Sequence, residues 1–167
     1  MIYVSLGANV PSKAGPPLRT LVAAIDAMPA HGIRVTARSP FYSSVAWPNA
    51  ADPAFVNAAV AVQTAKGPLE LLLALLAIER QFGRVRKTRW EPRCLDLDLI
   101  DYGGLISDEE ILQLPHPRLQ DRSFVLRPLK DICPAWRHPD TGVSIDELLG
   151  IAGEDGVQQL GEVPENG

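Results

Sequence analysis

Cysteine is scarce in this sequence, which contains two among its 167 residues. Cys94 and Cys133 are too few for a disulfide framework, and nothing near them gives the spacing of a zinc site. Long apolar runs are also missing. The longest, Leu71 to Ile78, is far shorter than the roughly 20 residues of a membrane-spanning helix. The N-terminus, MIYVSLGANV, has no basic segment or cleavage site, so we expect no signal peptide and a cytoplasmic protein without a membrane partner.

The chain also lacks an excess of positive charge. Its net charge of −4 argues against a protein that coats nucleic acids, and we expect no nucleic-acid partner. Residues 84–93 (RVRKTRWEPR) are the exception: they carry five positive side chains and one negative, a net +4, so the rest of the chain carries −8. A compact positive patch on an acidic protein predicts a small anionic ligand rather than a long polyanion.

The length and the ordinary proportions of apolar (46%) and charged (22%) residues suit one compact domain. We expect it to span residues 1–160, with a loose tail over 161–167, and to be a monomer. Apolar periodicity and turn residues predict strands over 2–6, 33–45, 55–64 and 94–102. They also predict helices from Pro16-Pro17 to Met28 and from Pro68 to about Phe82.

Later segments should add to this core. We expect a loop over residues 114–124, a short helix after it, and a last helix near Ile145 to Leu149, capped by Ser144 with Glu147 and ended by Gly150. The order β-α-β-β-α-β through Tyr102 predicts an α+β, ferredoxin-like fold. In such a fold, helices cover one face of a mainly antiparallel sheet, and the C-terminal elements are additions.

The stretch GRVRKTRWEPRCLDLDLIDYGG, residues 83–104, places charges of both signs side by side. Alternate residues of a strand share a face, so Asp96 and Asp98 should sit together, opposite three buried leucines. Paired carboxylates repel one another unless they bind a cation, and Mg²⁺ favours carboxylate, water and phosphate oxygens. The alternative is a solvated strand face, with Asp101 as one more exposed acid.

The arginines beside this pair favour a ligand that contains phosphate. Arg84, Arg86, Arg89 and Arg93 present forked donors that suit phosphate oxygens, although alone they would be read as a solvated basic loop. Together with the acids they predict phosphoryl transfer assisted by a metal ion. The sequence has no Gly-x-x-x-x-Gly-Lys-Ser/Thr motif, so this site is not built on a Walker loop.

A second candidate segment contains His116 between two prolines, with Arg118 and Arg122 nearby. A lone histidine often has only a structural hydrogen bond, but the arginines favour an anion here. Three aromatic residues, Trp47, Phe55 and Phe124, lie in or beside predicted loops. Binding and ordinary core packing are equal alternatives for these rings.

The run RWEPRCLDLDLI resembles the signature of the 6-hydroxymethyl-7,8-dihydropterin pyrophosphokinase family. The likeness continues, in order, through SLGAN, FYSS, FVNAAV, IERQFGRVRK and LPHPRLQDRSFVLRPL, over most of residues 1–135. An ordered set of motifs is far more specific than any one of them. The resemblance implies a ferredoxin-like enzyme of folate biosynthesis, which transfers pyrophosphate from ATP to the pterin's hydroxymethyl group and releases AMP.

The resemblance also implies roles for individual residues. Asp96 and Asp98 match acids that hold two Mg²⁺ ions, and Arg84 and Arg93 match arginines that support transfer. The ATP side is matched by Glu79, Arg86, Trp90, His116 and Arg122. The pterin side is matched by Ser44, Val45, Trp47, Phe55, Asn57 and Phe124, with two rings stacking on the bicycle and the amide reading its edge.

The sequence departs from the family pattern in a few places. Glu91 stands where Gly or Ala is usual, Phe55 replaces a frequent tyrosine, and Leu76 and Ile111 replace polar residues found in some members. We expect these changes to alter affinity rather than the type of reaction. Two alternatives stay open: another metal-dependent nucleotide transferase or hydrolase, and a non-catalytic ferredoxin-like module that binds a ligand or RNA. The RNA-binding variant is disfavoured because the sequence has no RNP motif.

Overall fold

The computed structural model describes residues 1–45, 51, 53–83 and 94–161, and the elements below lie within these ranges. The first part of the chain forms β1 (Ile2–Ala8), α1 (Pro17–Ala27), β2 (Arg34–Arg38), β3 (Tyr42–Ser44), β4 (Phe55–Gln63), α2 (Pro68–Gln81) and β5 (Asp96–Tyr102). The second part forms β6 (Ser107–Asp108), β7 (Gln113–Leu114), α3 (Ser123–Ile132), α4 (Ile145–Ala152) and β8 (Gln158–Gln159). Two 3₁₀ turns, η1 (Met28–His31) and η2 (Leu119–Asp121), complete these elements.

The main sheet has the strand order β5-β1-β4-β3-β8, and β2 pairs with β4 just beyond β3. All of these pairings are antiparallel. Each helical crossover skips one strand: α1 leads from β1 past β4, and α2 leads from β4 past β1. The predicted class, α+β with a mainly antiparallel sheet, is confirmed. The β6–β7 hairpin and β8 are strands that the sequence analysis did not predict.

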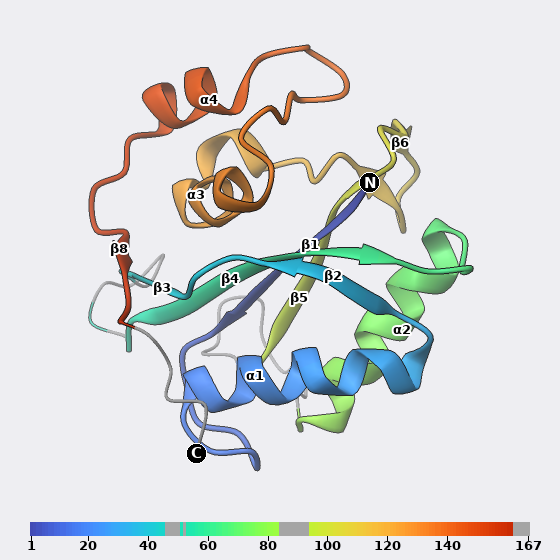
Figure 1. The fold of residues 1–167 in the computed structure, drawn as a ribbon, viewed down its shortest axis with the longest axis vertical. Coiled ribbons are helices and arrows are strands. Elements are labelled where there is room, and N and C mark those ends of the chain that lie inside the picture. Colours follow the sequence, from blue (N-terminus) through green and yellow to red (C-terminus); the bar gives the residue numbers. More distant parts are fainter. Residues whose placement is uncertain (46–50, 52, 84–93, 162–167) are drawn as a thin grey trace.

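Helices cover both faces of this sheet, with α1 and α2 on one side and α3 and α4 on the other (Figure 1). The α1/α2 side holds the larger buried cluster, to which the strands contribute Val4, Leu6, Ala58, Val60, Val62, Leu97 and Leu99. The α3/α4 side holds a second cluster, to which they contribute Tyr3, Ala61 and Ile100. The two helices of the β-α-β-β-α-β core therefore cover one face, as predicted, and the C-terminal additions α3 and α4 cover the other with an apolar face of their own.

Ser39 and Pro40 divide the predicted strand 33–45 into β2 and β3. Proline has no amide hydrogen to donate to a neighbouring strand. The backbone amide of Ser39 donates to the carbonyl of Ala59 at 2.9 Å, and its hydroxyl accepts from the amide of Ala59, also at 2.9 Å. One side chain thus replaces a backbone acceptor, and both halves of the segment stay paired with β4.

Local signals placed most helix ends correctly. Pro17 opens α1, and Gly83, with φ +87°, follows the end of α2 in the left-handed conformation that favours glycine. The hydroxyl of Ser144 accepts from the amide of Glu147 and caps α4 as predicted. However, α4 continues through Gly150 and ends at Gly153, whose φ is +76°. Within the described residues, no helix is both long enough and apolar enough to cross a membrane.

Candidate active site

The acid pair lies at the start of β5, the end strand of the sheet. Asp96 and Asp98 are half-buried, whereas Leu95, Leu97 and Leu99 are buried in the α1/α2 cluster. The two aspartates therefore share the opposite face of the strand, as alternation predicts. They pair with small residues of β1: Gly7 lies opposite Asp96 and Ser5 opposite Asp98.

These carboxylates suit Mg²⁺ as a two-ligand site. The described residues contain no group of three or more His, Cys, Asp or Glu side chains that could enclose a metal. Mg²⁺ does not need such a group, because it keeps several waters and usually takes one or two carboxylates plus phosphate oxygens. A neighbouring pair of aspartates on a sheet face matches that donor set.

Glu79 of α2 supports the backbone between the two aspartates. Its side chain is only 3% exposed, and its Oε1 accepts a hydrogen bond of 2.8 Å from the amide of Leu97. Since β5 ends the sheet on this side, a carboxylate oxygen takes the place of a neighbouring strand. Glu79 thus holds the strand that carries the acids, in addition to the nucleotide-side role that the resemblance implies.

The loop before α3 brings His116 against β5, near the acid pair. The amide of His116 donates to the carbonyl of Ile100 in β5 at 3.1 Å, and its Nδ1 accepts from the amide of Arg118 at 3.3 Å. Burial lowers the pKa of His116, and the positive charges of Arg122 and Arg118 lower it further, while Asp98 and Asp96 oppose them. The neutral imidazole, with Nδ1 as acceptor, keeps its proton on Nε2 as a donor.

The residues assigned to the pterin side lie on β4 and β3. Asn57 is 2% exposed, and its Nδ2 donates to the Ser44 hydroxyl at 2.7 Å. Phe55 lies next to Asn57 on the same face of β4 and is opposite Ser44 in the pairing of the two strands. Val45, just after β3, is 58% exposed.

Phe124 stands apart on α3, where it is half-buried against the α3/α4 cluster and lies under the guanidinium of Arg122. That guanidinium is 5.8 Å from the ring centroid. Core packing therefore accounts for part of this ring's environment. The stacking of Phe55 and Phe124 on the two faces of a pterin stays a prediction.

Six predicted residues lie outside the described part of the chain: Trp47, Arg84, Arg86, Arg89, Trp90 and Arg93. The residues on either side of the arginine-rich segment are described. Gly83 ends α2 four residues after Glu79, and Cys94 precedes the acid pair. The thiol of Cys94 contacts the carbonyl of Phe82 at 3.4 Å. The described residues on either side of the arginine-rich segment, Gly83 and Cys94, therefore lie near Glu79 and the aspartates.

Asp101 is not the solvated acid that the alternative interpretation of this strand expected. It is 6% exposed, accepts from the indole nitrogen of Trp136 at 2.9 Å, and accepts from the amide of Gly104 at 2.8 Å. Asp101 comes three residues after Asp98, and in a regular strand an odd separation would place the two side chains on opposite faces. Asp101 nevertheless faces the α3/α4 side, because the pairing of β5 with β1 is irregular between Tyr3 and Val4. Sequence alternation does not reveal such a shift.

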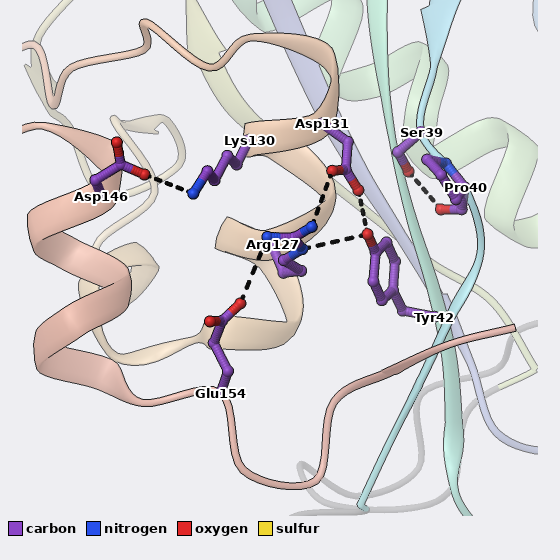
Figure 2. A network of polar contacts seen from close by, with 8 residues as sticks. All are labelled: Ser39, Pro40, Tyr42, Arg127, Lys130, Asp131, Asp146 and Glu154. Carbon is purple, nitrogen blue, oxygen red and sulfur yellow. Dashed lines mark hydrogen bonds and ion pairs between the residues drawn. The ribbon is translucent and has the colours of Figure 1, made fainter.

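The sequence analysis also missed a polar network that joins β3 to α3. Figure 2 shows Tyr42 pointing toward Asp131 and Arg127. The Tyr42 hydroxyl donates to Asp131, and the Nε of Arg127 donates to the Tyr42 hydroxyl oxygen at 3.3 Å. Arg127 also pairs with Asp131 at 3.4 Å and with Glu154 at 3.8 Å. The last contact holds the segment that leads to β8, which in turn pairs with β3.

This network supports the strand that carries Ser44 and Val45. Gly156 packs so closely on Val45 that a Cβ at Gly156 would lie 3.2 Å from Val45 Cγ2. Leu160 donates its amide to the carbonyl of Phe41 at 2.8 Å. The C-terminal segment therefore braces one wall of the candidate site.

Comparisons with known proteins identify a family and several relatives that this chain resembles. Residues 3–134 match the family described as 7,8-dihydro-6-hydroxymethylpterin-pyrophosphokinase (HPPK). The chain is 42% identical over 160 residues to the 2-amino-4-hydroxy-6-hydroxymethyldihydropteridine pyrophosphokinase of Pseudomonas aeruginosa, covering 95% of this chain and 96% of the relative. It is 43% identical over 144 residues to the folic acid synthesis protein fol1 of Pneumocystis carinii, covering 86% of this chain.

The chain spans only part of some relatives. It corresponds to 19% of the Pneumocystis protein. A crystal structure of an HPPK-DHPS protein in complex with substrates superposes with a TM-score of 0.72 and 13% identity, over 97% of this chain and 46% of that one. At that identity the superposition shows a shared fold alone.

Proposed function

Because the chain belongs to the 7,8-dihydro-6-hydroxymethylpterin-pyrophosphokinase family, we propose that it catalyses the reaction after which the family is named. It transfers pyrophosphate from ATP to 6-hydroxymethyl-7,8-dihydropterin, a step of folate biosynthesis. The pterin hydroxyl oxygen bonds to the β-phosphorus of ATP, the bond from that phosphorus to the α–β bridging oxygen breaks, and AMP leaves. The hydroxyl proton is released in the same step.

One observation carries this proposal. The paired aspartates of β5 and the Asn57–Ser44 pair of β4 and β3 lie in one sheet on either side of β1, and the His116 loop is bonded to β5 near the aspartates. They come from four separate segments of the chain, which are the segments in which the family motifs occur. ATP is a charged donor and the pterin is a flat acceptor, and the two must react with each other. Their binding sites therefore differ in chemistry and lie side by side.

The residues have complementary tasks in this proposal. Asp96 and Asp98 would hold Mg²⁺, two ions with ATP bound, which would neutralise the phosphate oxygens and orient the triphosphate. Glu79 keeps the backbone of the acid pair in place, and neutral His116 donates from Nε2 toward the nucleotide beside Arg122. Arg86 and Trp90 bind ATP, and Arg84 and Arg93 stabilise the charge that moves toward AMP.

The acceptor occupies the other half of the site. Asn57 reads the pterin edge, Phe55 and Phe124 stack on its two faces, and Ser44, Val45 and Trp47 form the adjoining wall. We also propose that residues 1–160 act as one domain, as a cytoplasmic monomer, with neither nucleic acid nor membrane as partner. Light scattering after size exclusion tests the monomer, and cell fractionation tests the location.

The direct test incubates the protein with Mg-ATP and 6-hydroxymethyl-7,8-dihydropterin and identifies the nucleotide product. AMP should form only when the pterin is present, whereas a hydrolase would release nucleotide without it. Asp96→Asn and Asp98→Asn should each lower kcat by about 10²-fold or more, the scale of losing one preorganised charged group. Asp108→Asn, on the exposed β6, is the matched control. Parent-like turnover by both site variants at saturating Mg²⁺ would refute the metal assignment.

A further inference from the structure

Gly7 lies between the two halves of the candidate site. In the antiparallel pairing of β1 with its two neighbours, Gly7 is opposite Asn57 of β4 and opposite Asp96 of β5. Residues that pair directly across antiparallel strands present their side chains on the same face. Asn57, Gly7 and Asp96 therefore form one row across three strands, about 10 Å from end to end at two strand spacings.

The missing side chain at Gly7 lets its neighbours lean across β1. A Cβ built on Gly7 would lie 3.4 Å from the Oδ1 of Asn57 and 3.8 Å from the Cδ1 of Phe55. The Nδ2 of Asn57 is directed away, to the Ser44 hydroxyl. The amide oxygen of Asn57 and the ring edge of Phe55 thus lie over the backbone of Gly7, whose other neighbour in the sheet is Asp96.

Side chains along this face of β1 also become smaller toward the site. Tyr3 packs in the α3/α4 cluster, Ser5 follows it opposite Asp98, and Gly7 comes last. The backbone at Gly7 does not itself require glycine, because Gly7 is not among the residues with positive φ. Neither strain nor a tight turn explains the glycine, which leaves the space above it as the reason.

We propose that Gly7 allows the acceptor to reach the nucleotide, by keeping clear the strip of sheet that the hydroxymethyl arm crosses. This inference rests on the proposed function. A flat ring held by Asn57 and Phe55 carries its reactive oxygen on a one-carbon arm. That oxygen must come within about 3–3.5 Å of the phosphorus of a nucleotide held on the Asp96 side. A methyl group in the middle of the row would stand where these two atoms meet.

The test compares Gly7→Ala and Gly7→Val with a matched control, Gly150→Ala. Gly150 lies inside α4 with nothing within 4 Å of an added Cβ, so alanine there should leave turnover unchanged and maintain or raise Tm. The measurements are kcat, KM for each substrate, Tm, and the Kd values of reduced pterin and of a non-hydrolysable ATP analogue, each measured alone.

Gly7→Ala should lower kcat by about 10- to 100-fold, since a misplacement of about 1 Å costs up to about 10²-fold. The Kd of the ATP analogue should stay within about twofold of the parent value, and Tm should change little. Gly7→Val should reduce turnover further and also weaken pterin binding. If Gly7→Val fails to fold, Gly7→Ala decides the question.

Two results would overturn the inference. One is parent-like kcat and pterin KM in Gly7→Ala. The other is a loss of turnover accompanied by equal losses in Tm and in affinity for the ATP analogue, which would make Gly7 a structural residue only. The parent protein separates this failure from that of the function. If the parent forms no pterin-dependent AMP, the proposed function itself is wrong, and the inference fails with it.

Discussion

The orientation of one amide decides what Asn57 can recognise. A free asparagine side chain presents its donor and acceptor in either order, but the bond to Ser44 assigns Nδ2 to the β3 side and Oδ1 to the Gly7 side. Asn57 then offers its carbonyl oxygen and one remaining N–H to a ligand. We therefore expect Ser44 to act on the pterin through Asn57, which is a more specific role than lining the adjoining loop.

Ser44→Ala should weaken reduced-pterin binding by roughly fivefold, or about 1 kcal/mol, because the amide loses the bond that orients it. Ser44→Thr keeps the hydroxyl and should restore most of the affinity. Ser43→Ala is the matched control: Ser43 is the neighbouring residue of β3 and points to the opposite face. Isothermal titration with pterin and with an ATP analogue measures both sites. Equal pterin affinities for Ser44→Ala and Ser43→Ala would contradict this role.

At the scale of the elements, β3 depends on contacts outside its own sheet pairing. It has three residues, and the hydroxyl of Tyr42 ties it to α3 through Asp131 and Arg127 (Figure 2). The side chains of Asp131 and Arg127 are 21% and 32% exposed, so this contact is more shielded than the Lys130–Asp146 ion pair, whose acid is 66% exposed. Partly shielded hydrogen bonds contribute more than exposed ion pairs.

Tyr42→Phe should lower the free energy of unfolding by about 1–2 kcal/mol, because Asp131 and Arg127 lose a shared partner. Lys130→Gln, which removes the exposed ion pair from the same helix, should change it by less than about 0.5 kcal/mol. Urea denaturation followed by circular dichroism measures both. The prediction fails if the two variants are equally stable.

For the molecule as a whole, the buried phenol groups of Tyr3 and Tyr42 make the free energy of unfolding depend on pH in the alkaline range. Burial raises the pKa of Tyr3, and the hydrogen bond to Cys133 and the nearby charge of Asp101 raise it further. Burial and the bond to Asp131 raise the pKa of Tyr42, against a smaller opposing effect of Arg127. The folded protein therefore keeps both phenolic protons at pH values where the unfolded chain loses them.

The sign follows from these directions. The contribution of both phenols is fully present below pH 10, the ordinary phenol pKa, and declines as the pH rises above it. For Tyr3 the decline is on the order of 1 kcal/mol per pH unit. Urea titrations between pH 8 and 11 should show this decline in the parent protein. Tyr3→Phe should have a shallower slope above pH 10, whatever its stability at pH 8. An unchanged slope would show that Tyr3 does not contribute.

Some features of this protein follow from short stretches of sequence. The leucines at 95, 97 and 99 predict which face of β5 is buried, because side chains in a strand alternate with a period of two. Pro17, Gly83 and Ser144 mark helix ends because their effects on backbone conformation and capping are local. The ordered motifs were likewise enough to identify the family, since they need no knowledge of contacts.

Other features depend on contacts between residues that are far apart in the chain. The row that places Gly7 between Asn57 and Asp96 is a register of three strands, and no local pattern encodes register across such separations. The burial of Asp101 under Trp136, the second helical layer and the bracing of β3 by Tyr42 depend on how α3 and α4 pack. Periodicity specifies the face that a strand buries. Packing between distant segments specifies which side chains from different elements come together.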